Sequence, residues 1–260
     1  MVGPAGMTSF GYADLEQAIS PARAGRYLRS TIDSITGRPD PDAALALYEH
    51  NVDVGAAAWR TIGDVEIVLR NILADAISCH HATIRSNPTH RWYDDPPWFV
   101  SGRWFTSDTV SSIRSAMKRA KDPGPGPAPR PGEGRVVAES TLGFWRYLLI
   151  ARYEHTLWNP AIRSRFPALS HLSGSDSRKA VHARMEKLNY LRNRVAHHEP
   201  IYEPFALPGH PNRIDTVTTL DEAIEMVSWS NPAAAGWIGA RSSYVAVVTA
   251  RPAIPLAGGS

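Results

Sequence analysis

The feature that most constrains the fold is an apolar stripe at helical spacing between residues 53 and 79. Its members recur three or four residues apart and are Trp59, Ile62, Val65, Leu69, Ile72, Leu73, Ala76 and Ile77. In a helix this spacing gathers the side chains on one face, which other elements must cover. The sequence therefore predicts a long amphipathic helix that packs against further helices.

The same periodicity predicts helices along the rest of the chain, over residues 21–35, 40–50, 106–120, 136–157, 160–166, 176–198, 219–229 and 232–240. Several begin with a polar residue before proline, which is typical of a helix start: Ser20-Pro21, Asn159-Pro160 and Asn231-Pro232. Thr219 and Glu222 have the spacing of a capping box. The best strand signal, residues 243–248, could equally be an extended terminus. We expect an all-α helical bundle.

A proline- and glycine-rich stretch divides the chain. Residues 122–134 hold five prolines and four glycines in thirteen positions, which predicts a mobile surface loop rather than a helix or strand. The halves on either side each carry apolar stripes without a partner of their own. We therefore expect one domain over residues 20–241 with this loop inserted, a flexible segment over 1–19 and a largely disordered tail over 242–260.

The composition limits where in the cell this protein is expected and which kinds of partner it can bind. The single cysteine, Cys79, excludes an internal disulfide framework and a cysteine-based metal cage. No basic and apolar leader opens the chain, and no apolar run approaches the roughly 20 residues that span a bilayer. We expect a cytoplasmic protein without a membrane partner. The net charge of +3 is compatible with a polyanionic partner but does not demand one, whereas the arginines gathered between residues 178 and 194 slightly favour phosphate.

The predicted helix over residues 176–198 places a charged residue among apolar ones. Its apolar face consists of Val181, Met185, Leu188, Leu191 and Val195, and Arg192 falls inside that stripe. A guanidinium cannot lose its proton, so its burial without a partner would be costly. We expect Arg192 to meet an acidic partner, a cleft or a second subunit. Glu66, four residues before Arg70 on the long helix, is a candidate partner.

Asn193 and His197 are four residues apart and project from one side of the same helix. Pro200 disfavours helical geometry at Glu199, which predicts a helix end near His198. Arg192 and His197 lie about 140° apart on an ideal helix. They meet at one small group only if the helix loosens or another element supplies the rest. An ordinary helix end without catalytic function has the same residue types, so chemistry alone leaves both interpretations open.

The string from Leu191 to Ile201, LRNRVAHHEPI, resembles the motif of the Abi-like family of bacterial abortive-infection proteins, within the HEPN superfamily. Glu66-Ile67-Val68-Leu69-Arg70-Asn71 resembles an upstream element of that family, and the Gly143-Phe144-Trp145 segment resembles a central one. Leu157-Trp158, Phe166 and Trp229 follow in the expected order. The resemblance covers about residues 45–240 and gives no role to the first forty residues or to the proline-glycine stretch.

The resemblance implies a HEPN-like bundle and an endoribonuclease that needs no metal or cofactor. RNA would be cleaved by attack of a ribose 2′-OH on the adjacent phosphate, which leaves a 2′,3′-cyclic phosphate. His197 would act as general acid or base, Arg192 would stabilise charge on the phosphate, and Asn193 would orient one of them. A homodimer would bring two such helices together. Supporting roles would fall to Glu66, Arg70, Asn71, Arg194, His198 and Glu199.

Two alternatives stay open at this point: a non-catalytic helical module that binds RNA or protein, and a toxin component held inactive by a protein or RNA antitoxin. Other chemistries are disfavoured. His80-His81 and His197-His198 are adjacent pairs that point about 100° apart on a helix, and no His-Glu-x-x-His spacing occurs. Phosphate-binding loops and G-x-S-x-G serine motifs are also absent from the sequence.

Overall fold

The computed structural model describes residues 10–33, 36–85, 91–93, 105–120 and 133–253. It is 74% helical with one small two-stranded sheet, which confirms the all-α prediction. In chain order the elements are α1 (Tyr12–Ile19), α2 (Pro21–Arg29), α3 (Pro41–Arg85), α5 (Ser107–Ala120), α6 (Glu133–Glu139), α7 (Leu142–Tyr147), η1 (Ala151–Tyr153), η2 (Glu154–Ile162), η3 (Arg163–Arg165), η4 (Pro167–Leu169), α8 (Gly174–Ala196), β1 (Phe205–Ala206), β2 (Arg213–Ile214), α9 (Thr216–Ser228), α10 (Pro232–Arg241) and α11 (Tyr244–Thr249).

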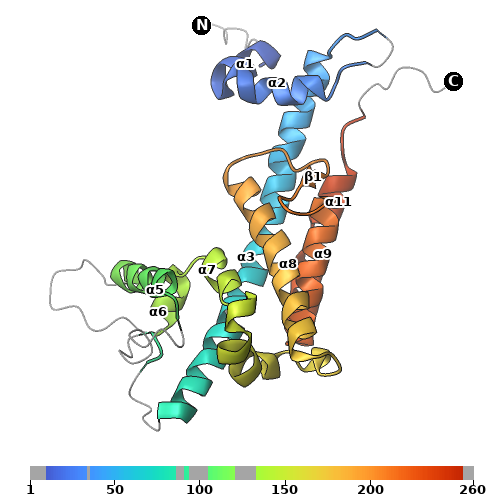
Figure 1. Ribbon diagram of the computed structural model, residues 1–260. Helices are drawn as coiled ribbons and strands as arrows, with labels where there is room; N and C mark the ends of the chain where they lie inside the picture. Colours follow the sequence, from blue (N-terminus) through green and yellow to red (C-terminus); the bar gives the residue numbers. More distant parts are fainter. Residues whose placement is uncertain (1–9, 34–35, 86–90, 94–104, 121–132, 254–260) are drawn as a thin grey trace, which may run out of the picture.

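Helix α3 is the spine of the molecule. Its 45 residues make a rod of about 67 Å, and α8 and α9 run alongside it (Figure 1). The prediction of two helices, 40–50 and 53–79, was wrong because nothing interrupts the backbone between them. Asn51, at the expected break, stays helical and uses its side chain for tertiary hydrogen bonds. One continuous helix thus connects the two ends of the fold.

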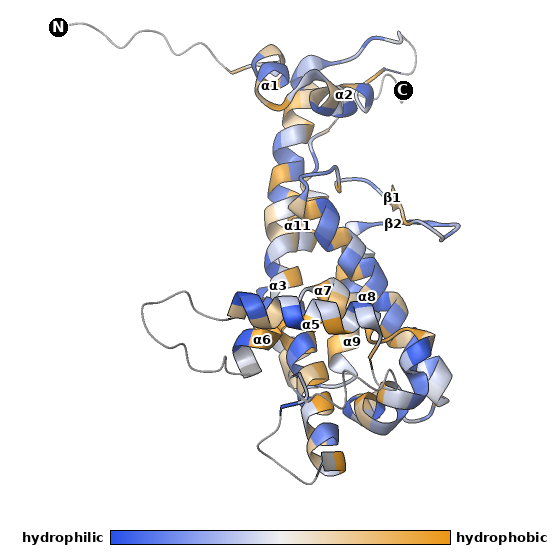
Figure 2. Cartoon of the chain, turned by 60° about the vertical axis from the view of Figure 1, so that its left-hand side comes forward, coloured by the Kyte–Doolittle hydropathy of each residue, from blue (hydrophilic) through white to orange (hydrophobic). Residues whose placement is uncertain are grey.

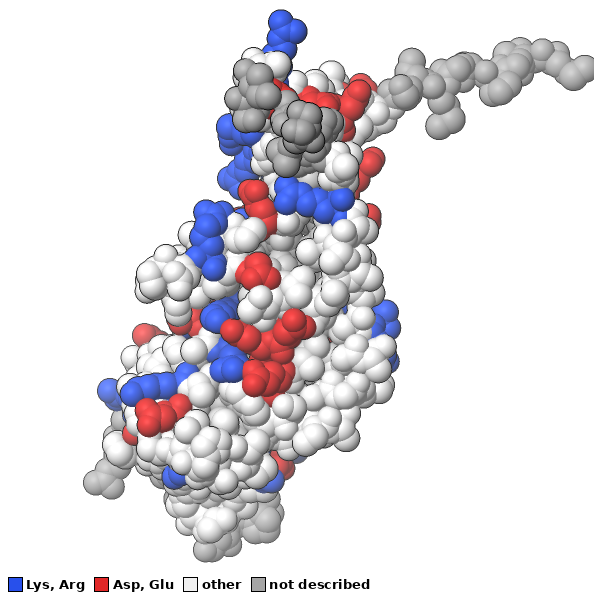
Figure 3. Space-filling model, turned by 90° about the vertical axis from the view of Figure 1, so that its right-hand side faces the viewer, with Lys and Arg blue, Asp and Glu red and all other residues white. Residues whose placement is uncertain are grey.

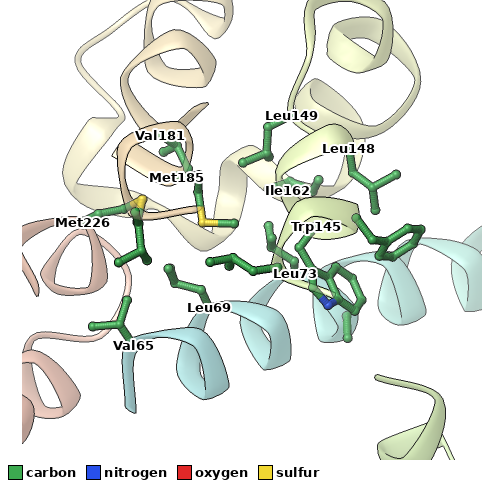
Figure 4. Packing of buried hydrophobic residues seen from close by; sticks show 14 of the residues in the cluster. Val65, Leu69, Leu73, Trp145, Leu148, Leu149, Ile162, Val181, Met185 and Met226 are labelled. Carbon is green, nitrogen blue, oxygen red and sulfur yellow. The ribbon is translucent and has the colours of Figure 1, made fainter. Parts of the chain in front are cut away.

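The core lies where α3, α8 and α9 meet the segment over residues 142–162. Val65, Leu69 and Leu73 of α3 face Met185 of α8 and Met226 of α9 (Figure 4). The predicted apolar faces are confirmed in most of their members, which are at most 2% exposed for Ile62, Val65, Leu69, Leu73, Ala76, Ile77, Val181, Met185, Leu188 and Leu191. Ile72 and Val195 are only partly buried, and Trp59, also predicted in the stripe, is 46% exposed.

Two short helices cross the N-terminal end of α3 (Figure 2). Residues 12–19 form α1, so the predicted flexible segment is wrong for that part. Pro21 occupies the first position of α2, as its ring geometry favours. α2 ends at Arg29, earlier than the predicted residue 35. A small aromatic cluster of Tyr27, Leu47 and Tyr202 fixes α2 on α3.

The predicted helix over residues 136–157 is broken in two places. Thr141 accepts a hydrogen bond from the amide of Phe144 (3.2 Å) and so caps a new helix, α7, directly after α6. Beyond α7 the chain tightens into η1 and then widens into the π-helix η2. Pro160 lies inside η2, so Asn159-Pro160 does not start a helix as predicted.

The C-terminal part departs from prediction at its boundaries. α9 begins at Thr216 because Asp215 caps it by accepting from the amide of Thr218 (2.8 Å), and the expected capping box at Thr219 does not form. Asn231 does cap α10, as predicted. Residues 244–249, expected to be extended or disordered, form α11 against α3. A hairpin, with Phe205 opposite Ile214, was not anticipated.

The proline-glycine stretch falls mostly outside the described residues. The last two of its thirteen positions, Glu133 and Gly134, already belong to α6. The predicted loop is therefore wrong for residues 133–134, and for residues 122–132 it stays a prediction.

Candidate active site at the end of helix α8

Helix α8 ends in a Schellman motif that fixes the residues of the predicted site. His197 is the C-cap, and the amide of Glu199 donates back to the carbonyl of Arg194 (2.9 Å). His198 takes a φ of 53°, a left-handed conformation that glycine adopts most easily. The helix thus ends at Ala196, within two residues of the prediction. Its last turn leaves the His197 side chain exposed.

A buried asparagine holds the segment that follows the helix. Asn51 of α3, 5% exposed, accepts from the amide of Ile201 (2.8 Å). It also donates to the hydroxyl of Tyr27 (3.1 Å) and to the carbonyl of Glu199 (3.5 Å). Burial raises the pKa of Tyr27 to about 12, so that hydroxyl keeps its proton at neutral pH. One side chain therefore joins α2, α3 and the chain after His197.

Arg194 and Glu199, both predicted as supporting residues, form part of this scaffold. The guanidinium of Arg194 pairs with Glu199 (3.1 Å), donates to the carbonyl of Pro200 (2.7 Å) and lies over the ring of Phe205 (4.6 Å). On the other side, Arg23 of α2 donates to the carbonyl of His197 (3.4 Å). The backbone around His197 is therefore restrained from two sides.

Arg192 does not meet the carboxylate that the sequence suggested. Its guanidinium lies over the ring of Trp59 (5.6 Å to the centroid) and donates to the side chain of Asn193 (3.4 Å). Among the described residues it forms no ion pair, so the candidate pairing with Glu66 does not form. The reason is position along α3: Glu66 lies seven residues beyond Trp59, about 10 Å along the axis.

The other arginines and lysines of α8 all have carboxylate partners, which sets Arg192 apart. The four nearest pairs are Arg178–Glu154 (3.0 Å), Arg184–Glu225 (2.7 Å), Lys187–Glu222 (2.8 Å) and Arg194–Glu199 (3.1 Å), with Lys179–Asp176 longer at 3.6 Å. Most of the arginine concentration predicted to favour phosphate is thus used within the fold. Arg192 is left as the charge on α8 without an acidic partner in the described part of the chain.

A groove of about 740 Å³ runs between the N-terminal half of α3 and the end of α8. Trp59, His198 and Glu199 line it, together with Arg23 and Tyr48. Small and apolar residues make up much of the rest of its lining, namely Val52, Gly55, Ala56, Val195 and Ala196. Val52 is 50% exposed and Trp59 is 46% exposed. An open apolar groove therefore lies directly beside the helix end that carries His197.

Three of the predicted supporting residues lie away from His197. Gly55 lies opposite Val195, since a Cβ at Gly55 would be 4.0 Å from that side chain. Glu66 is eleven residues further along α3, about 16 Å from that level, and Arg70 and Asn71 are further still. The structure therefore does not bring these three residues to the helix end within one chain.

Asn193 is exposed beside Arg192. Its side chain forms no hydrogen bond with the imidazole of His197 in the described structure, although the amide of His197 donates to its backbone carbonyl (3.0 Å). Because α8 stays regular to Ala196, Arg192 and His197 leave the helix about 140° apart, as on an ideal helix. A single copy of the chain thus presents Arg192 and His197 on different sides of one helix.

Sequence reasoning missed Asn51, Arg23 and the role of Trp59. Trp59 was placed in the core because its spacing fits the apolar stripe, and nothing local marks it as exposed. Asn51 had a signal that could have been used: an asparagine between two helical stretches with no glycine or proline beside it. Asparagine is unfavourable inside a helix, so a side-chain hydrogen bond to another part of the fold is expected where one occurs.

Comparison of the chain with protein-family models, with curated proteins and with solved structures found no match. Within the described residues, no cluster of three or more histidine, cysteine or acidic side chains is arranged to hold a metal ion. Nor does any described helix combine the length and apolar character required to cross a bilayer. The residues of the site and their geometry are thus what a functional proposal has to rest on.

Proposed function

We propose that this protein is a metal-independent endoribonuclease of the HEPN type that acts in abortive infection. The observation that carries the proposal is Arg192, the arginine of α8 without a carboxylate partner in the described structure, which lies over Trp59 and is five residues before the exposed His197. A guanidinium that is placed on an aromatic ring but not neutralised is suited to bind an oxyanion. The motif around it supplies the class of reaction.

In the proposed reaction the 2′-oxygen of a ribose attacks the adjacent phosphorus atom. A base removes the 2′ proton, and an acid protonates the departing 5′-oxygen of the next nucleotide. The products are a 2′,3′-cyclic phosphate and a 5′-hydroxyl end, with no oxidant or metal consumed. Arg192 would stabilise the added negative charge on the phosphate oxygens, and Asn193 would hold one of those oxygens or the Arg192 fork.

The reaction requires both an acid and a base, and of the two exposed histidines in the motif the proposal assigns acid–base chemistry to His197 alone. A second copy of the chain would supply the other imidazole if two α8 ends faced each other across a two-fold axis. The groove beside the site supports such a partner. Half-exposed Val52 and Trp59 offer apolar area, and Gly55 and Ala56 let a second backbone approach closely.

The cleavage test uses the purified full chain, single-stranded RNA and excess EDTA. We expect fragments from the parent and from His171→Ala, a control that removes an exposed histidine elsewhere, and none from His197→Ala or Arg192→Ala. Binding without cleavage, after any bound protein or RNA antitoxin has been removed, would instead favour the non-catalytic module. Equal cleavage by His197→Ala would contradict the proposal.

The dimer is tested by sedimentation. Val52→Glu should convert the parent dimer to monomer and abolish cleavage, because it places a charge in the groove. The matched control is Val245→Glu on α11, where the valine is 49% exposed and lies outside the groove. A parent chain that sediments as a monomer at micromolar concentration would contradict the two-copy site.

A further inference from the structure

A second pocket, of about 370 Å³, lies between α2, the end of α8 and the hairpin. Four arginines line it: Arg26 and Arg29 from α2, Arg194 from α8 and Arg213 from β2. Glu203 is the acidic residue in its wall. Four arginines from three elements thus line one small pocket, where a bound anion would offset the repulsion between them.

Two of these arginines are held in place by the fold. Arg194 is 17% exposed in its side chain and is fixed by Glu199, by a backbone carbonyl and by the ring of Phe205. Arg213 donates from Nε to the carbonyl of Pro204 (2.8 Å) and a second time from Nη2 to the same oxygen. Because their positions are set before any ligand arrives, little side-chain entropy would be lost on binding.

The other two carry charge that the fold does not neutralise. Arg26 and Arg29 are exposed and form no ion pair among the described residues. Four arginines set against Glu203 and Glu199 leave two positive charges at the pocket. The face of the molecule drawn in Figure 3 has basic and acidic side chains intermixed, with an acidic group near its middle. That face is therefore not uniformly basic, whereas Arg26 and Arg29 give this pocket an excess of positive charge.

The pocket is connected to the proposed active site along α2. Arg23, Arg26 and Arg29 are three residues apart, so they form a ridge about 9 Å long on one side of that helix. Arg23 is at the active-site end, where it donates to the carbonyl of His197 and lines the groove with His198. Positive groups thus continue in a line from the end of α8 into the arginine pocket.

We propose that the arginine pocket binds a phosphate group of the RNA strand next to the one that is cleaved. This inference rests on the proposed function and adds the path of the substrate. Arginine forks bind phosphate oxygens in pairs. A line of charges that extends beyond one pocket suits a chain of phosphates better than a single ion, which would contact the pocket alone.

The test measures binding rather than cleavage. In a full-length His197→Ala background, the affinity for a fluorescent single-stranded RNA is followed by anisotropy as the salt concentration rises. Each phosphate contact contributes about 0.7 to the slope of log K against log salt for single strands. Because the pocket would bind one phosphate group, Arg26→Gln with Arg29→Gln should weaken binding and reduce the slope by about 0.7. The matched control is Arg114→Gln with Arg152→Gln, two exposed arginines on α5 and η1.

Equal slopes for the two double variants would overturn the inference. Calorimetry with inorganic phosphate tests whether the pocket binds a free phosphate ion instead of a phosphate group of RNA. Tight binding of inorganic phosphate that Arg26→Gln with Arg29→Gln abolishes, with an unchanged RNA slope, would assign the pocket to a small anion and overturn its RNA role. The two proposals can be contradicted separately. If RNA binding depends on Arg26 and Arg29 but the parent does not cleave RNA, only the nuclease proposal is contradicted. If the parent cleaves RNA but the two double variants have equal slopes, only the role of this pocket is contradicted.

Discussion

Removal of the Asn51 side chain should affect the proposed site, although no described contact joins Asn51 to Arg192, Asn193 or His197. The change Asn51→Ala deletes a side chain that joins α2, α3 and the chain after α8. Three hydrogen bonds are lost, to the amide of Ile201, the hydroxyl of Tyr27 and the carbonyl of Glu199. No other described side chain is bonded to the amide of Ile201, which would be left buried.

The expected loss follows from these contacts. A buried donor or acceptor without a partner costs about 1–3 kcal/mol, and an ordinary hydrogen bond contributes roughly 1 kcal/mol. The bond to Ile201 falls in the first class because Ile201 is 2% exposed, and the bond to Tyr27 falls in the second. The 3.5 Å contact with Glu199 adds little. The free energy of unfolding should therefore fall by about 2–4 kcal/mol.

Urea unfolding followed by tryptophan fluorescence measures the loss, and RNA cleavage under native conditions measures its effect on His197. We expect cleavage to fall as well, because the segment after α8 is no longer held. The control is Asn71→Ala, an exposed asparagine of the same helix that should change stability by less than about 0.5 kcal/mol. An Asn51→Ala protein as stable as Asn71→Ala would refute the reasoning.

Three further predictions concern stability. Glu154→Gln leaves the buried Arg178 guanidinium (6% exposed) without its carboxylate and should lower the free energy of unfolding by about 3–5 kcal/mol. Asp75→Asn, at the exposed pair with Arg165, should change the free energy of unfolding by at most about 1 kcal/mol. Denaturant titration of the two variants compares these losses. Burial lowers the pKa of His50 and of His182 below the ordinary value of 6.5. Below that pH these two groups bind more protons in the unfolded chain than in the folded chain, so stability should fall from about pH 7 to about pH 5. His182→Gln should make this fall less steep in a series of unfolding curves, and an unaltered pH dependence would contradict the assignment. His198→Gly should raise the melting temperature by about 1–4 °C because it relieves the left-handed backbone at φ 53°, and cleavage should persist if His198 is structural.

The helical class and the buried faces could be predicted from the sequence because they depend on spacing alone. Val65, Leu69 and Leu73 on α3 and Met185 on α8 were assigned to the core by periodicity, and they are buried. Proline and asparagine also predicted the start of α10, since capping is a local interaction. These features need no knowledge of which helix packs against which.

The site was only partly predictable because its contacts join segments far apart in the chain. The position where α8 ends could be predicted from Pro200. The partner of Arg192 could not, because a helix packed alongside α8 could place either Trp59 or Glu66 against it. The choice depends on the register between α3 and α8, which the long uninterrupted α3 sets. The arginine pocket was missed for the same reason: its residues come from α2, α8 and the hairpin, and only the fold brings them together.

The chemistry of the new RNA ends tests the central claim most directly. Fragments produced by the parent chain in excess EDTA are analysed by mass spectrometry for the groups at the new termini. The account predicts a 2′,3′-cyclic phosphate on one fragment and a 5′-hydroxyl on the next, and no fragments from Arg192→Ala or His197→Ala. Fragments that end in a 3′-hydroxyl and a 5′-phosphate, or RNA left intact by a dimeric, antitoxin-free parent, would contradict it.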